Sequence, residues 1–164
     1  METLLAFCSW LERSPFGSEV RESLWIFPTV ETLHLFGMVL LFSTIAVMDL
    51  RLLGRVMRRE KVTRLAANLL PWTWAGFVVM LLTGTVLFSA HAAKTYIQNP
   101  LFQLKMILIF AAGINALVFH LTIYRRVVQW DYAAPTPFAA KAAATLSLLL
   151  WGAVIAAGRW IGFV

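Results

Sequence analysis

Four long stretches of the chain are almost wholly apolar, and short polar stretches separate them. The apolar stretches cover about residues 24–53, 71–93, 100–124 and 137–163. Each supplies the ~20 residues that an α-helix needs to cross a bilayer. No alternating pattern typical of β-strands competes with this interpretation. The sequence therefore predicts an all-α integral membrane protein, a four-helix bundle that forms a single membrane domain over residues 1–164.

Proline and capping residues mark where the predicted helices begin. Proline is tolerated in the first turn because the first helical N–H groups have no intrahelical partner. The prolines near the starts of the four stretches are Pro28, Pro71, Pro100 and Pro137. Asn99 and Thr136 directly precede two of them. Both are residue types that cap helix N-termini, so we expect them to act as N-caps.

The first residues, "METLLAFCSWLERS", precede the apolar stretches. They have no basic n-region and only a short apolar run, so a signal peptide is not predicted. In a helix, Leu4, Leu5, Cys8 and Leu11 share one face. The pattern favours a short amphipathic helix over residues 2–13 that lies at the membrane interface. A disordered tail is the alternative.

Composition and charge set the expected environment and orientation. The chain is 60% hydrophobic and only 13% charged, which is too little charge for the surface of a soluble domain. The stretch 51–64 carries six Arg and Lys, and with Arg125, Arg126 and Lys141 it places nine of the 14 basic residues on one side. This side is expected to face the cytoplasm, with both termini outside. Membrane topology explains the +6 net charge, so nucleic-acid binding is not predicted.

All three histidines fall inside predicted spans, where polar groups need a partner or a purpose. At ~1.5 Å per residue, His34 lies roughly 10–12 Å below the outer edge, and His91 lies about one turn from that edge. His120 lies in the other half of the membrane. Gly84 precedes His91 by seven residues, and Gly113 precedes His120 by seven. Each glycine therefore shares a helical face with its histidine and leaves room for a flat ligand or a neighbouring helix.

Three hypotheses account for these histidines. In the first, His34 and His91 are axial ligands of a b-type haem, and His120 serves a second haem or a structural hydrogen bond. Haem b needs no C-x-x-C-H attachment motif. In the second, the histidines bind copper, with help from some of the six methionines. In the third, each histidine makes only a hydrogen bond across the bundle.

The other polar residues in the spans have expected partners. Glu31 and Lys105 both lie about one turn below the outer edge, and we expect an ion pair between them. Its functional alternative is a proton path or a site for a quinone headgroup. Asp49 lies near the inner edge, where its available partners are Arg51, Arg126 and His120. Asn115 is expected to hydrogen-bond another helix.

Six segments together resemble a family of small bacterial inner-membrane proteins with four helices and no assigned function. They are "FPTVETLHLFG", "MDLRLLG", "LPWTWAGF", "TGTVLF", "NPLFQLK" and "NALVFH", and they span about residues 24–124. The resemblance implies that certain positions matter, and His91 is not among them. These positions are Glu31, His34, Asp49, Arg51, Lys105, Asn115 and His120. More distantly, the chain is similar to CopD-type copper-resistance membrane proteins and to four-helix b-type cytochromes.

These observations lead to one main functional expectation and two alternatives. The main expectation is a haem-b electron carrier in the bilayer that exchanges electrons with quinone or with a periplasmic redox protein. The first alternative is a copper- or other metal-handling membrane protein. The second is a cofactor-free subunit that anchors or assembles a larger complex, or a homo-oligomer. Ser and Thr residues are scattered without a general base, so no catalytic residue is predicted.

Overall fold

The computed structural model describes residues 2–90, 97, 99–132 and 135–161, and their regular structure is helical throughout. Four helices are long and apolar enough to cross a membrane. They are α3 (Ile26–Leu52), α4 (Val62–Ala90), α5 (Pro100–Val118) with its continuation, and α6 (Phe138–Trp160). The continuation of α5 is a π-helix, η2 (Phe119–Ile123), and then a 3₁₀ helix, η3 (Tyr124–Gln129). The all-α fold and the multi-pass membrane class are confirmed.

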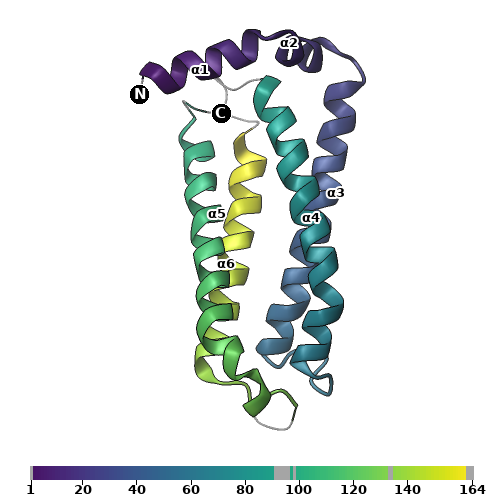
Figure 1. Ribbon diagram of the computed structural model, residues 1–164, viewed down its shortest axis with the longest axis vertical. Coiled ribbons are helices and arrows are strands. Elements are labelled where there is room, and N and C mark those ends of the chain that lie inside the picture. The colour runs from purple at the N-terminus through teal and green to yellow at the C-terminus, as the bar shows by residue number, and fades with distance from the viewer. Residues whose placement is uncertain (1, 91–96, 98, 133–134, 162–164) are drawn as a thin grey trace.

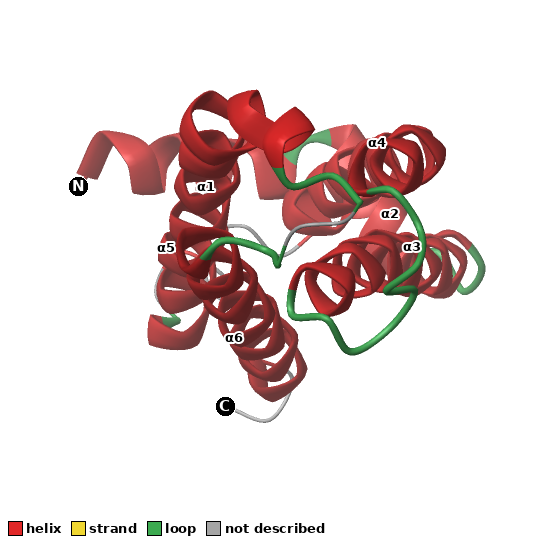
Figure 2. Ribbon diagram, turned by 90° about the horizontal axis from the view of Figure 1, so that it is seen from below, coloured by secondary structure: helices red, strands yellow, loops and turns green. Residues whose placement is uncertain are grey.

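The four long helices run side by side, and two short helices lie across one end of them (Figure 1). These are α1 (Glu2–Arg13) and α2 (Pro15–Glu22). The α3 helix packs mainly against α4, and α5 packs mainly against α6, so the bundle consists of two helical hairpins. A contact between α3 and α6 joins the two hairpins, whose arrangement is visible along the bundle axis in Figure 2.

The two ends of the bundle differ in charge. We call the end that α1 and α2 cover the terminal end, and the opposite end the basic end. Nine Arg and Lys residues belong to the elements and loop of the basic end. They are Arg51, Arg55, Arg58, Arg59, Lys61, Arg64, Arg125, Arg126 and Lys141. The helices thus gather at one end the charges that the sequence assigned to one side of the membrane.

The sides of the bundle carry large apolar side chains that are exposed in the isolated chain. Examples are Phe36 on α3, Trp72 on α4, Phe110 on α5 and Leu149 on α6, with exposed fractions between 60% and 72%. Such faces suit lipid tails, which are as apolar as the side chains themselves. The largest buried apolar cluster lies at the basic end. Its members are Leu52, Val62, Phe119, Val127, Trp130, Ala140 and Ala144.

Two glycines bring α3 and α4 unusually close together. A Cβ atom on Gly76 would lie 2.8 Å from the backbone N of Leu41, and one on Gly37 would lie 2.8 Å from Cγ1 of Val79. Real Cβ atoms do not approach other atoms so closely. Small residues at such positions let membrane helices gain packing energy that lipid cannot supply.

The start of α4 differs from the sequence prediction. The helix begins at Val62, so Pro71 lies inside it and not near its start. Pro71 has no N–H and removes the hydrogen bond to the backbone carbonyl four residues earlier. The additional turns form because Val62 and Leu65 are buried at the basic end and because Asp131 caps the helix.

Caps at the other helix starts are partly as predicted. The side chain of Asn99 accepts hydrogen bonds from the N–H groups of Leu101 at 2.8 Å and Phe102 at 3.4 Å, so its N-cap role is confirmed. Thr136 is not the N-cap of α6: Pro137 occupies that position, and no side chain caps the helix. Proline fixes the extended backbone that leads into the helix, so the chain turns there without a capping hydroxyl.

The predicted amphipathic helix over residues 2–13 is confirmed as α1. Cys8 is only 1% exposed and packs against Phe88 of α4 and Ile97. The positions of the Leu4 and Leu5 side chains lie outside what the structure describes. Helix α2 was not predicted, although Ser14 accepts a hydrogen bond from the N–H of Gly17, and Ser-Pro is a recognisable helix start.

Asp131 offers a test of how α4 is capped. Its carboxylate accepts hydrogen bonds from Thr63 N at 2.9 Å and Thr63 Oγ1 at 2.8 Å. Desolvation opposes ionisation of this carboxylate, but the hydrogen bonds from Thr63 and the charge of Lys61 outweigh it and hold the pKa of Asp131 below its usual range. An Asp131→Ala variant should lose about 1 kcal/mol of unfolding free energy at neutral pH.

The pH dependence of this loss follows from the lowered pKa. A carboxylate with a lowered pKa stabilises the fold above the unfolded pKa of about 3.9. The difference between wild type and Asp131→Ala should therefore shrink as the pH falls below about 4 and vanish once the folded-state carboxylate is protonated. Thermal unfolding in detergent micelles measures it, with Asp131→Asn as the control that keeps an acceptor. An unchanged difference at low pH would contradict this assignment.

Candidate histidine–lysine site

The imidazole of His34 is held by a hydroxyl on the neighbouring helix. Its Nδ1 lies 2.8 Å from Oγ1 of Thr83 on α4. The Thr83 hydroxyl donates its single proton to the backbone carbonyl of Val79 at 2.6 Å. It can therefore only accept from His34, so Nδ1 carries the proton in the neutral ring. The second ring nitrogen, Nε2, is left with a free lone pair.

Gly84 makes room for the His34 ring. A Cβ atom on Gly84 would lie 3.3 Å from Cε1 and 3.8 Å from Nδ1 of His34. The sequence predicted that Gly84 leaves space beside His91, and the structure places the His34 ring against it. A side chain at this position would press on the imidazole edge that leads to Nε2.

Lys105 of α5 extends this site to the second hairpin. Its side chain lies along Gly158 of α6, where a Cβ atom would be 3.4 Å from Nζ and 3.6 Å from Cε. Lys105 is half-buried and lies ~8 Å from the terminal end of α5, near the level of His34 on α3. We call His34, Thr83, Gly84, Lys105 and Gly158 the histidine–lysine site, which takes at least one residue from each membrane helix.

The predicted ion pair between Glu31 and Lys105 does not form. Glu31 is exposed, and among the described residues it has no ion pair with Lys105. Glu31 lies five residues into α3, only ~8 Å from the helix start, so its carboxylate can reach the polar interface. It is also 60° around the helix from His34. Lys105 therefore has no carboxylate partner in the part of the chain that the structure describes.

His120 is in a different environment and is not brought near His34. It is exposed, and its Nδ1 lies 2.9 Å from the backbone carbonyl of Ala116 on its own helix. Its ring also contacts Tyr124, with centroids 5.4 Å apart. His34 lies ~12 Å from the terminal end of α3, and His120 lies ~30 Å from the terminal end of α5. A difference of roughly 18 Å along the bundle prevents the two imidazoles from binding one iron.

Gly113 also differs from its expected role. A Cβ atom on Gly113 would meet nothing within 4 Å. Gly113 and His120 do share a helical face, but it is the outward face of α5, and both residues are exposed. The remaining histidine of the hypothesis, His91, lies outside the described residues.

Two polar residues lie nearer the basic end. Nδ2 of Asn115 donates to the Ala143 carbonyl of α6 at 3.0 Å, so the predicted hydrogen bond to another helix is confirmed. Asp49 is 7% exposed, and its Oδ2 atom has no hydrogen-bond partner among the described residues. Arg51, a predicted partner of Asp49, instead donates from Nε and Nη2 to a backbone carbonyl of the α3–α4 loop at 3.0 and 2.7 Å.

Two contributors to the histidine–lysine site were not singled out from the sequence. They are Thr83 and Gly158. A lone Thr in an apolar helix usually bonds its own backbone, so it does not stand out by residue type. The available signal was that Thr83 and Gly84 are adjacent in the sequence. A hydroxyl beside a glycine can hold a ring in the space that the glycine leaves.

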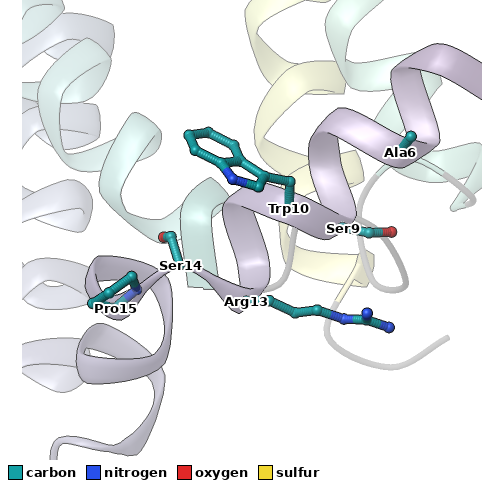
Figure 3. A pocket seen from close by; sticks show the side chains of 6 residues that line it. All are labelled: Ala6, Ser9, Trp10, Arg13, Ser14 and Pro15. Carbon is teal, nitrogen blue, oxygen red and sulfur yellow. The ribbon is translucent and has the colours of Figure 1, made fainter.

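A surface hollow of about 430 Å³ lies away from this site, at the turn between α1 and α2. It is lined by Ala6, Ser9, Trp10, Arg13, Ser14 and Pro15. Figure 3 shows that Trp10 and Arg13 project away from each other, so they do not converge on a common ligand. Trp10 is 65% exposed, which suits a helix at the membrane interface.

The fold and the site define a multi-pass α-helical membrane protein with a histidine and a lysine gathered between its two hairpins. The chain belongs to a family of unknown function (DUF6644), whose model matches residues 7–164. No curated protein and no solved structure matches the chain. The resemblance to a family without assigned function is therefore confirmed, while the more distant likeness to copper-resistance proteins and b-type cytochromes gains no support.

Proposed function

We propose that this protein is a membrane electron carrier that binds b-type haem through Nε2 of His34. The observation that carries the proposal is the pair of hydrogen bonds in which His34 donates to Thr83 and Thr83 donates to Val79. Histidines that ligate metals commonly donate their other ring N–H to a fixed acceptor, which sets the tautomer and the ring orientation. A bound haem supplies one-electron chemistry.

The protein groups around His34 have distinct roles in this proposal. Thr83 orients the ring and keeps the proton on Nδ1, so Nε2 is available as a ligand. Gly84 keeps the ring edge clear. Lys105 supplies a positive charge that has no carboxylate partner among the described residues, and it would pair with a carboxylate of the haem. The apolar helices exclude water from the site and so stabilise the neutral imidazole.

The sequence supplies a candidate for the second axial position. It is His91, which follows Ala90, the last described residue of α4, in the sequence. His120 is not a ligand of the same iron, because it lies roughly 18 Å further along the bundle. Its exposed position at the lipid-facing side of α5 supports a local structural role, in which it bonds the Ala116 carbonyl.

The orientation of the protein completes the proposal. The nine basic residues of the basic end favour a cytoplasmic location for that end in a bacterial inner membrane. The terminal end and the histidine–lysine site are then near the periplasmic face, with both termini outside. Electron exchange would occur there with a membrane quinone or a periplasmic redox protein.

The proposal is tested by the visible spectrum of the full-length protein, purified in detergent from haem-replete cells. A reduced-minus-oxidised difference spectrum should contain b-type bands. A spectrum without such bands would contradict the proposal. Copper in stoichiometric amount, without haem and lost in His34→Ala, would instead favour metal handling. The described residues contain no cluster of three His, Cys, Asp or Glu side chains, so the geometry supports that alternative less well.

The third hypothesis, a cofactor-free anchor or assembly subunit, is distinguished by the same samples. It predicts that neither haem nor copper copurifies and that substitution of His34 lowers only stability. Its support is the exposed apolar sides of the helices, which lipid contact explains equally well.

The role of Thr83 can be tested with a substitution that keeps the side-chain shape. A Thr83→Val variant removes the acceptor for His34 Nδ1–H, and we expect haem affinity to fall by ~10–100-fold. Thr85→Val is the matched control, because Thr85 is exposed and donates only to Leu81 of its own helix at 2.8 Å. Haem titration of both variants measures the difference. Equal affinities would contradict the orienting role of Thr83.

A further inference from the structure

We propose that Asp49 is a proton-binding site, a carboxyl group that the bundle holds in its uncharged form at neutral pH. The inference is independent of haem and concerns the basic end of the bundle. It depends on three observations: the burial of the carboxyl group, an oxygen without a partner, and neighbouring charges that are bonded elsewhere or exposed.

The carboxyl group of Asp49 is buried inside the bundle. Its exposed fraction is 7%, and it lies on α3 between Met48, which packs on the apolar cluster of the basic end, and the last turn of the helix. The atom Oδ2 has no hydrogen-bond partner among the described residues and is fully inaccessible.

An unpaired oxygen has different consequences for the two forms of the acid. A carboxylate spreads its charge over both oxygens, so an ionised Asp49 would keep half of a buried negative charge on an atom that nothing stabilises. An uncharged carboxyl group has an O–H donor on one oxygen and an acceptor on the other, but it carries no net charge, so its burial without partners costs less free energy. The uncharged form therefore fits the observed surroundings better than the ionised form does.

The charged and titratable groups around Asp49 are bonded elsewhere or exposed, and among the described residues none forms an ion pair with it. Arg51 is held by a backbone carbonyl of the α3–α4 loop. Asp131 caps α4, and Tyr124 and His120 contact each other. The remaining charged side chains of this end, on the loop, α4, η3 and α6, are exposed. They are Arg55, Arg58, Arg59, Glu60, Lys61, Arg64, Arg125, Arg126 and Lys141.

A membrane-soluble carbodiimide, dicyclohexylcarbodiimide, tests the proposal. This reagent takes the proton of an uncharged carboxyl group onto nitrogen while the carboxyl oxygen adds to its central carbon. The O-acylisourea so formed rearranges to an N-acylurea, and all atoms of both reactants are retained. Peptide mass spectrometry of the full-length protein, labelled at pH 7 in detergent, should locate this adduct on Asp49. Asp131, whose pKa is held below its usual range, should stay unlabelled because it is ionised.

Three comparisons decide the outcome. Asp49→Asn should lose the adduct, and it should also lose an infrared carbonyl band typical of an uncharged carboxyl group. Labelling of Asp49 that appears only after acidification would overturn the proposal. Protection by sodium chloride but not by choline chloride would also overturn it, because Oδ2 would then hold a cation and not a proton. If Asp49→Asn does not fold, the position of the adduct in the wild-type protein still tests the proposal.

Discussion

Replacement of His34 by alanine should abolish haem binding, so that the b-type bands disappear from the reduced-minus-oxidised spectrum of the purified protein. The imidazole is the ligand in the proposal, and no other described histidine can take its place. Thr83 and Lys105 remain in the variant, but neither is one of the side chains that commonly ligate haem iron. The amount of haem bound per protein molecule is measured from the absorption of the pyridine–haem complex.

The control for this result is His120→Ala. His120 is exposed and bonds its own helix, so its loss should leave haem content unchanged. A His34→Ala protein that retains its haem would show that His34 is not a ligand. Loss of haem in both variants would point instead to general damage to the fold, which circular dichroism of the same samples can detect.

A Gly76→Val substitution should cause a large loss of stability at the interface between α3 and α4. Its Cβ would lie 2.8 Å from the backbone N and 3.0 Å from the Cα of Leu41. Backbone atoms cannot rotate aside as a flexible side chain can, so α3 and α4 must separate. Overpacking of this kind costs about 1–3 kcal/mol, and we expect the upper part of that range. Thermal unfolding in detergent micelles measures the change.

Gly113→Val is the matched control for this substitution. It introduces the same side chain into the interior of a membrane helix, at a position where a Cβ meets nothing within 4 Å. Its midpoint of unfolding should stay close to that of wild type. Equal destabilisation by the two changes would mean that the close approach of α3 and α4 contributes little to stability.

The membrane helices were largely predictable from the sequence, because length and apolar content determine which segments can cross a bilayer. The start of α4 was not, since Val62 to Leu70 includes Arg64 and Asn68 and lies where hydropathy falls. That segment is helical because Val62 packs into the basic-end cluster and Asp131 caps it. Both causes are tertiary contacts, and Asp131 lies 68 positions from Thr63.

The candidate site was only partly predictable, for a geometric reason. Periodicity relates residues on one helix, so it correctly placed Gly113 and His120 on a common face. It does not give the rotation of that helix relative to its neighbours, and the face proved to be the outward one. The same limit explains why Glu31 was expected beside Lys105. The partner of His34, Thr83, lies 49 positions away on another helix, which no spacing along the chain reveals.

The division into two hairpins also fixes the order in which the site is built during synthesis. His34, Thr83 and Gly84 all belong to α3 and α4, so the ribosome has made these three residues before it reaches Lys105. Their hydrogen bond needs nothing from α5 or α6. A nascent chain with only its first hairpin in the bilayer therefore already has an oriented imidazole. The positive charge of Lys105 joins it afterwards, when the second hairpin docks through the contact between α3 and α6.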